Sequence, residues 1–256
     1  MKQFIRRVCN ALGYEIHRRV VDPGPERANP FLQQKVLLDG VLDPVIFDVG
    51  AHVGTVTRQY RLLFPNATIY SFEPFPESFE KLRDSFASDS RVHPYQLGFA
   101  DRTGIVLFNV NIEEMTNSLL TTDAAGSSFW GNKVLDTTQQ IEVEITTLDA
   151  FCQDRDVEHI DILKIDTQGA ERLVLQGSNR MLQEKSISYV YAEMLLVPTY
   201  KGQAKFHELI EFLDNRGYSL FSIYNPDYRS GSNRLLQVDA IFFSECLKAH
   251  SQTVRV

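Results

Sequence analysis

The chain is poor in cysteine, in long hydrophobic runs and in positive charge. Its three cysteines, Cys9, Cys152 and Cys246, form no C-x-x-C pair. This argues against a disulfide framework or a zinc site and favours a reducing, cytoplasmic location. No apolar run reaches the ~20 residues that a membrane-spanning helix requires. The net charge of -7 comes without a long basic block, so nucleic acid is disfavoured as the main partner.

Residues 1–30 differ in character from the rest of the chain. The stretch MKQFIRRVCNALGYEIHRR is basic and amphipathic, and Arg6 and Arg7 interrupt the apolar core that a signal peptide would need. We expect a helix that either docks on the main domain or makes peripheral contact with an anionic membrane surface or a partner. Three prolines in VVDPGPERANP then predict a linker, so residues 31–256 should form one main domain.

From Pro44 onward, strand-like segments alternate with helix-like segments. We expect strands over residues 45–50, 67–74, 91–99, 159–166 and 186–194, and helices over 54–64, 76–86 and 203–215. Residues 218–224 and 234–243 predict an antiparallel pair near the C-terminus. The alternation predicts an α/β fold with a doubly wound, mostly parallel sheet and an antiparallel edge.

Two further segments with alternating polarity, 104–110 and 140–148, predict an inserted β-pair attached to the main sheet. The long segment 111–136 between them predicts a lid or binding loop. Ligands of doubly wound sheets bind beyond the carboxyl ends of the strands. Acidic residues fall at four such predicted ends: Asp48, Glu73, Asp166 and Glu193.

The stretch VIFDVGAHVGTVT predicts a strand, a tight turn at Gly50 and Gly54, and a helix. No lysine follows Gly54 as in a phosphate-binding P-loop, and His52 stands where a dinucleotide fingerprint needs its second glycine. An acid before the turn, Asp48, suits a ligand with a positive group and ribose hydroxyls. S-adenosylmethionine meets these demands, and the alternative is that the glycines serve turn geometry alone.

Glu73, at the end of the next strand, suits the ribose hydroxyls of such a ligand. Alternatively, it stabilises the N-terminus of the following helix. The predicted cofactor-binding residues are Asp48, Gly50, His52, Gly54, Thr55, Glu73, Pro74, Asn117, Ser118 and Asp166.

In the segments VIFDVGAHVGTVT, YSFEP, NSLL, TTLDAF, DILKIDTQGAERLVLQG, YVYAEM and LLQVDAIFF, the chain resembles the FkbM family of S-adenosylmethionine-dependent methyltransferases. The segments run in the family's order from Pro44 to Phe243. The resemblance implies a seven-stranded class I methyltransferase sheet and methyl transfer, usually to oxygen, with small-molecule or glycan acceptors such as sugar and polyketide hydroxyls. The chain departs from the family at His52, where asparagine is common, and at Gln168, where glutamate is frequent.

Chemistry is expected around Asp166, because an alcohol needs a base or a metal to become a good nucleophile. Asp166 is interpreted as a base or substrate anchor, as a Mg²⁺ ligand together with Glu193, or as a hydrogen-bond acceptor for the turn at 168–170. Lys164 points to the same face as Asp166, either as the partner of a carboxylate or in contact with substrate. His52 is a candidate base, a cofactor contact or a packing residue.

The remaining candidates lie near the ends of helices and in loops. Glu171 either stabilises its helix N-terminus or belongs to the site. Asn117 and Ser118 close over the ligands or make ordinary loop hydrogen bonds. The loop 224–234 helps to place the acceptor, with Phe129 and Trp130 as an apolar wall or as packing residues. Two rival functions are a nicotinamide-dependent oxidoreductase and a non-catalytic binding protein that retains the fold.

Overall fold

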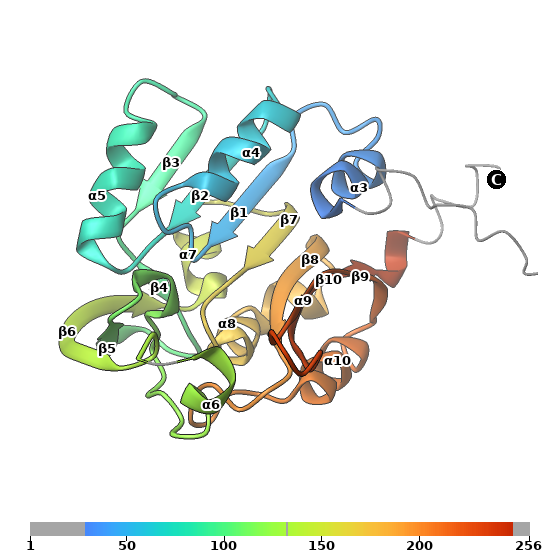
Figure 1. Cartoon of the computed structure of the whole chain (residues 1–256). Helices are drawn as coiled ribbons and strands as arrows, with labels where there is room; N and C mark the ends of the chain where they lie inside the picture. Colours follow the sequence, from blue (N-terminus) through green and yellow to red (C-terminus); the bar gives the residue numbers. More distant parts are fainter. Residues whose placement is uncertain (1–28, 132, 248–256) are drawn as a thin grey trace, which may run out of the picture.

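A seven-stranded sheet forms the centre of the protein, whose computed structural model describes residues 29–131 and 133–247. The strand order is β3-β2-β1-β7-β8-β10-β9 (Figure 1). The first five of these strands pair in parallel, and β10 lies antiparallel between β8 and β9, so the predicted mixed sheet is confirmed. The strands are β1 (Val45–Val49), β2 (Thr68–Phe72), β3 (Val92–Tyr95), β7 (Ile160–Ile165), β8 (Ile187–Leu195), β9 (Tyr218–Tyr228) and β10 (Leu235–Ser244).

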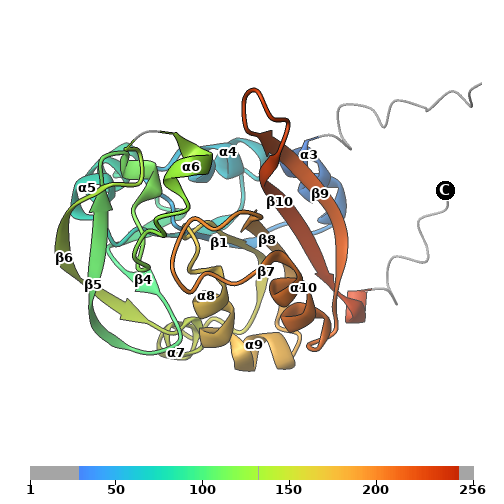
Figure 2. The same ribbon diagram turned by 60° about the horizontal axis from the view of Figure 1, so that its bottom comes forward.

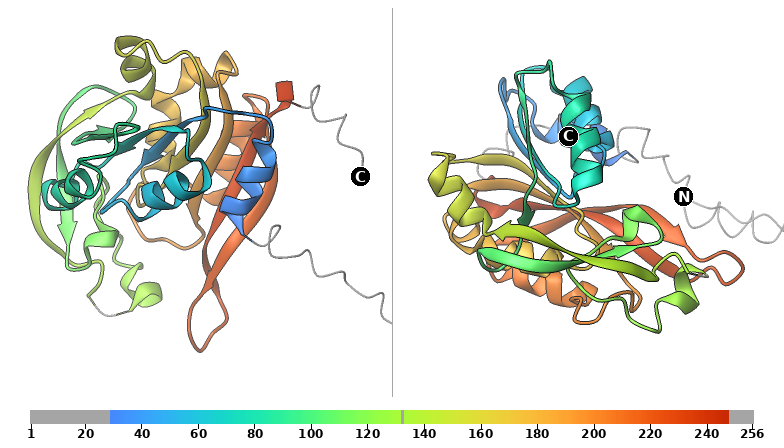
Figure 3. Two further views of the ribbon diagram at one scale, coloured as in Figure 1. Left: turned by 90° about the horizontal axis from the view of Figure 1, so that it is seen from above. Right: turned by 90° about the vertical axis from the view of Figure 1, so that its left-hand side faces the viewer.

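Helices cover both faces of this sheet. One face packs against α3 (Pro30–Leu37), α4 (Thr55–Leu63) and α5 (Pro76–Ser85). The other face packs against α7 (Leu148–Asp154), α8 (Glu171–Gly177), α9 (Asn179–Gln183) and α10 (Phe206–Asp214). Helices α4 and α5 lie on one side of the sheet and α10 on the other (Figure 3, right). A separate hydrophobic core fills each side. Strand β7 is buried along its whole length, as expected of a central parallel strand with helices on both sides.

The predicted β-pair exists but is not attached to the main sheet, which corrects the expectation. A second sheet of order β4-β6-β5 contains β4 (Gly98–Phe99), β5 (Gly104–Asn111) and β6 (Thr137–Thr146) (Figure 2). The expected single strand 91–99 breaks after Tyr95, and its last two residues pair with Ile145 and Thr146. The hydrogen bonds of this segment therefore pass from the main sheet to the second sheet.

The described residues begin next to helix α3, which starts at Pro30, the last residue of the predicted linker. The side chain of Asn29 caps α3 by accepting hydrogen bonds from the backbone N–H groups of Phe31 (2.9 Å) and Leu32 (3.2 Å), and Pro30 occupies the first turn. The predicted amphipathic helix and its membrane contact fall within residues 1–28, outside the described residues. Within the described ranges, no helix has the length and apolar character needed to cross a bilayer.

Candidate active site

The glycine turn after β1 is held against two neighbouring strands. The backbone N–H groups of Gly50 and Ala51 donate to the carbonyl oxygen of Phe72, at 3.0 and 2.9 Å. Gly50 has φ +78°, and a Cβ there would lie 1.8 Å from the carbonyl oxygen of Asp166. Gly54 has φ +84°, and its Cβ would lie 2.8 Å or less from side-chain carbons of Leu82 and Phe86. Both glycines are therefore required by close packing within the protein.

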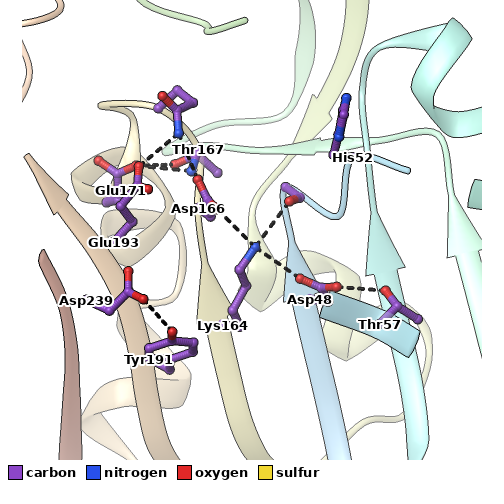
Figure 4. A network of polar contacts seen from close by, with 12 residues as sticks. Asp48, His52, Thr57, Lys164, Asp166, Thr167, Glu171, Tyr191, Glu193 and Asp239 are labelled. Carbon is purple, nitrogen blue, oxygen red and sulfur yellow. Dashed lines mark hydrogen bonds and ion pairs between the residues drawn. The ribbon is translucent and has the colours of Figure 1, made fainter. Parts of the chain in front are cut away.

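Asp48 lies beneath this turn and is fully buried. Its Oδ2 accepts a hydrogen bond from Thr57 Oγ1 (2.7 Å), and its Oδ1 lies 3.3 Å from Lys164 Nζ (Figure 4). Lys164 Nζ in turn donates to the carbonyl oxygen of Gly50 (3.2 Å). Asp48 is not among the residues that line the neighbouring cleft, so it supports the turn from below.

Lys164 is enclosed by carboxylates, as the ion-pair interpretation expects. Besides Asp48, its Nζ lies 3.4 Å from Asp166 Oδ2, and the side chain is 6% exposed. Burial alone would lower the pKa of the ammonium, but Asp166 and Asp48 outweigh this effect and raise the pKa above its usual value. A lysine held in its charged form serves as a structural cation, and this geometry speaks against a role as a base.

A cleft of about 800 Å³, partly open to solvent, lies beside the turn at the carboxyl ends of β1, β2 and β7. Its apolar walls include Phe72, Leu97 and Phe99. Three polar atoms in its lining, His52 Nε2, Ser78 Oγ and Asn117 Nδ2, are buried without a hydrogen-bond partner among the described residues. The predicted site residues that line it are Gly50, His52, Glu73, Pro74, Asn117, Asp166 and Glu193.

Glu73 and His52 lie together in this cleft. The carboxylate of Glu73 accepts hydrogen bonds from the backbone N–H groups of His52 (2.8 Å) and Phe75 (2.9 Å). Burial raises the pKa of Glu73 to about 7. His52 adopts a left-handed backbone conformation with φ +49°, and its Nε2 lies 3.7 Å from Glu114 Oε2. The cleft therefore places a carboxylate that can accept hydrogen bonds from hydroxyl groups beside an imidazole ring.

Asp166 and Glu193 are bridged by the side-chain amide of Gln168. Its Nε2 donates to Asp166 Oδ1 (2.9 Å) and to Glu193 Oε2 (2.8 Å). Gln168 has φ +53°, and its Oε1 accepts a hydrogen bond from the hydroxyl of Tyr200 (3.2 Å). Glu193 does not end its strand as predicted, because β8 continues to Leu195. The described residues contain no group of three or more His, Cys, Asp or Glu side chains placed to hold a metal ion.

Glu171 closes the turn that follows Asp166. Its Oε1 accepts hydrogen bonds from Thr167 N (3.0 Å), Thr167 Oγ1 (3.2 Å) and Gly169 N (3.0 Å). The side chain is buried and does not line the cleft, so its contacts are those of a structural cap. Burial raises the pKa of Glu171 to about 7.

The raised pKa of Glu171 predicts how stability changes with pH. The folded protein binds this proton more tightly than the unfolded chain, so stability is highest below pH 4.5 for this group and falls as pH rises through about 7. Between pH 5 and 7.5, the free energy of unfolding should therefore fall by on the order of 2–3 kcal/mol more in the parent protein than in the Glu171→Gln variant. Urea unfolding of the ligand-free protein between pH 5 and 7.5 measures it. The exposed Glu80→Gln serves as the control, and equal slopes for Glu171→Gln and the parent would contradict the prediction.

The two predicted loop residues behave differently. Asn117 lines the cleft, and its Oδ1 accepts a hydrogen bond from Asn111 N (2.8 Å). Ser118 is fully buried outside the cleft, and its Oγ donates to the carbonyl oxygen of Gln168 (2.7 Å). Ser118 therefore ties the loop to the turn after β7, which matches the alternative of ordinary loop hydrogen bonds.

Other predicted residues lie outside the cleft lining. Thr55 is exposed in the first turn of α4, and direct cofactor contacts of Thr55 and Gly54 stay predictions. Trp130, at the end of α6 (Ser127–Trp130), donates from Nε1 to Thr199 Oγ1 (2.8 Å). Phe129 packs beneath the guanidinium of Arg234, whose Cζ lies 4.7 Å from the ring centroid. Sequence reasoning missed Ser78, Leu97 and Phe99, which carry no motif that distinguishes them from core residues.

A second cavity opens on the other side of Asp166 and Glu193, which line both spaces. It has a volume of about 690 Å³, including space open to solvent. It lies on the sheet face covered by α3 and α4, and its lining includes Phe31, Tyr191, Asn225, Gln237 and Asp239. The two cavities therefore meet at one pair of carboxyl groups.

The strand order and the cleft at the ends of β1, β2 and β7 define a Rossmann-like fold of the class I methyltransferases. Residues 48–220 match the family model of the methyltransferase FkbM domain, and the chain belongs to this family. The protein is therefore an S-adenosylmethionine-dependent methyltransferase, and the oxidoreductase alternative is wrong.

Three relatives are similar to this chain in sequence. The 2-O-methyltransferase NoeI of Sinorhizobium fredii is 28% identical over 177 residues, which cover 67% of this chain and 71% of that protein. The 31-O-demethyl-FK506 methyltransferase FkbM of Streptomyces tacrolimicus is 29% identical, covering 52% and 58%. The hexuronic acid methyltransferase AglP of Haloferax volcanii is 24% identical, covering 59% and 56%. A solved rRNA methylase from Streptococcus thermophilus aligns with a TM-score of 0.47 at 11% identity, covering 84% and 96%.

Proposed function

We propose that the protein transfers a methyl group from S-adenosylmethionine to a hydroxyl of a sugar, glycan or secondary metabolite. The observation that carries the proposal is the meeting of two cavities at Asp166 and Glu193. One cavity has the features of a nucleoside site and the other is open to an acceptor. The relatives named as 2-O-, 31-O- and hexuronic acid methyltransferases support an oxygen acceptor.

The lining of the first cleft fits the cofactor. Phe72, Leu97 and Phe99 offer an apolar wall for a purine ring, and Glu73 offers carboxylate oxygens for ribose hydroxyls. The partnerless Asn117 Nδ2 supplies a further hydrogen-bond donor in the lining. Gly50, His52 and Pro74 complete the set proposed to hold S-adenosylmethionine.

Asp166 is the proposed proton acceptor. When bound, S-adenosylmethionine supplies an electrophilic methyl group on sulfur and leaves as S-adenosylhomocysteine. The acceptor hydroxyl forms the new O–C bond as the C–S bond breaks, and its proton passes to the carboxylate of Asp166. His52 is the second candidate base, but it lines only the first cleft, whereas Asp166 lines both cavities. Lys164 holds Asp166 in place through its ion pair (3.4 Å).

The prediction of a Mg²⁺ ion finds little support in the residues that would coordinate it. Asp166 and Glu193 are the residues that would hold the ion, but the amide of Gln168 donates to both of them and so competes for the same oxygens. No step of the proposed reaction passes through a metal. Turnover in the presence of EDTA should match turnover in added MgCl₂, and a loss of activity in EDTA that MgCl₂ restores would reinstate the ion.

Cofactor binding is tested at Glu73. At pH 8.5, where a carboxyl group with a pKa of about 7 is ionised, Glu73→Gln should weaken binding of S-adenosylhomocysteine by roughly tenfold or more, because hydrogen bonds to a charged group contribute about 1.5–3 kcal/mol. Isothermal titration measures the change, with Glu77→Gln on the exposed side of α5 as the matched control. Equal affinities in the two variants would show that Glu73 does not contact the ligand. Binding without any release of S-adenosylhomocysteine from S-adenosylmethionine across an acceptor panel would favour the non-catalytic alternative.

A further inference from the structure

The second cavity has a polar end built around Asp239. Its Oδ2 accepts a hydrogen bond from the hydroxyl of Tyr191 (2.6 Å; Figure 4). The same oxygen accepts a second hydrogen bond from Asn225 Nδ2 (2.7 Å), and Asp239 is partly buried. Both of these bonds end on the same oxygen, so Oδ1 is left for another donor. Burial raises the pKa of Asp239, as expected for a carboxyl group withdrawn from water.

A carboxyl group stands directly opposite Asp239. In the register of β8 and β10, Glu193 pairs with Asp239. Burial, together with the neighbouring Asp166, raises the pKa of Glu193 well above its usual value, which relieves the repulsion between two facing carboxyl groups. Within the described lining of this cavity, the cation is Lys164, and its ammonium already lies 3.3 Å from Asp48 and 3.4 Å from Asp166. The cavity therefore presents hydrogen-bond acceptors without a cation that is available to a ligand.

Asn225 is brought to this cavity by irregular backbone. It has φ +46°, in the left-handed region that few side chains other than asparagine enter readily. The pairing of β9 with β10 shifts register on both sides of Gln237, which also lines the cavity. Bulges of this kind redirect side chains and occur near active sites. The irregular backbone directs the amide of Asn225 toward Asp239.

An aromatic ring from a distant part of the chain completes the lining. Phe31 of α3 lies with its ring centroid 5.7 Å from that of Tyr191, in an edge-on arrangement. Carboxyl and amide groups that bind adjacent hydroxyls, next to an apolar ring that contacts C–H groups, suit a polyhydroxylated ring. The acidic lining disfavours a ligand that carries its own carboxylate or phosphate.

We propose that this cavity binds the methyl acceptor as a neutral pyranose ring, with Asp239, Asn225 and Gln237 bonding its hydroxyls and Phe31 contacting its apolar face. The inference rests on the proposed function and narrows it to neutral sugars. A hydroxyl of a ring bound there lies beside Asp166 and Glu193, which the two cavities share.

The test uses ligand-observed saturation-transfer NMR on the full chain, with and without saturating S-adenosylhomocysteine. The probes are methyl α-D-glucopyranoside, methyl α-D-mannopyranoside, methyl α-L-rhamnopyranoside and the anionic methyl α-D-glucopyranosiduronate. At least one neutral glycoside should bind, and the glucuronide should bind more weakly than the glucoside. Asp239→Asn and Asn225→Ala should each weaken glycoside binding about tenfold or more, whereas the exposed Asp227→Asn on β9 should not.

The outcomes separate the two proposals. Unchanged affinity for S-adenosylhomocysteine in the Asp239 and Asn225 variants shows that they remain folded and that the cofactor site is intact. If the cofactor product binds but no glycoside does, if the glucuronide binds best, or if the variants bind glycosides normally, the inference is overturned while methyl transfer stands. If glycosides bind and the variants lose them but S-adenosylhomocysteine does not bind, the sugar site stands and the proposed methyl transfer falls.

Discussion

Asp166→Asn is expected to lower kcat about 10³-fold, because a positioned general base contributes roughly 10²–10⁴-fold. Asparagine keeps the shape of the side chain, and its oxygen can still accept the hydrogen bond from Gln168 Nε2. Lys164 keeps its pairing with Asp48 at 3.3 Å, so the fold should persist. Single-turnover formation of S-adenosylhomocysteine, with an acceptor that supports turnover, measures the loss.

The matched control lies on the same strand as this site. Asp161 is near the opposite end of β7, where its Oδ2 accepts a hydrogen bond from Val45 N (2.8 Å). Asp161→Asn should leave kcat within about twofold, because Asp161 lines neither cavity and the amide oxygen of asparagine can still accept the hydrogen bond from Val45 N. An Asp166→Asn enzyme that turns over at the parent rate would remove Asp166 as the base, and His52→Gln would then be the informative variant.

Gly50→Ala is expected to abolish measurable binding of S-adenosylhomocysteine and to destabilise the protein by about 2–5 kcal/mol. The left-handed backbone costs an alanine about 1–2 kcal/mol. The clash of its Cβ, 1.8 Å from the carbonyl oxygen of Asp166, adds about 1–3 kcal/mol as the turn and β7 move apart. That movement displaces both the glycine turn and the residues after β7, which together line the cofactor cleft.

Gly40 provides a control that isolates the clash. It has φ +86°, and a Cβ there would meet no atom within 4 Å. Gly40→Ala should therefore show the backbone cost alone, about 1–2 kcal/mol, with normal ligand binding. Urea unfolding and isothermal titration of both variants provide the comparison. Equal losses of stability at the two positions would mean that the turn accommodates the methyl group.

Much of the fold follows from local pattern. The alternation of buried apolar runs with amphipathic segments placed β1, β2, β7 and β8 in a parallel sheet, because an uninterrupted apolar strand is stable only with helices on both faces. Acidic residues at or near the carboxyl ends of these strands then had to lie at one edge of the sheet. The prediction that Lys164 pairs with a carboxylate followed from period-2 alternation along β7 and the cost of an unpaired buried charge.

What escaped prediction depends on contacts between distant segments. The sequence allowed Asp166 to accept a hydrogen bond from the turn at 168–170, and the amide of Gln168 does donate to it. What no local pattern predicted is that the same amide also donates to Glu193, 25 positions further along the chain than Gln168. The second sheet exists because residues 98–99 pair with β6, and no local pattern distinguishes this from a longer β3. Asp48 was predicted to bind the cofactor, and its buried contacts with Thr57 and Lys164 beneath the turn could not be read from the sequence; direct contact with the cofactor stays a prediction. In all three cases the local sequence identified the residues but did not show which distant residues they contact.

The placement of β9 and β10 at the sheet edge has a consequence for how acceptor choice can change. The β9–β10 hairpin projects beyond the helices (Figure 3, left), and it carries Asn225, Gln237 and Asp239. The match to the family model ends at residue 220, before any of the three. The groups proposed for the donor lie inside the matched region, so exchanging the hairpin alone offers a route to redirect the enzyme to another alcohol while leaving its methyl donor site untouched.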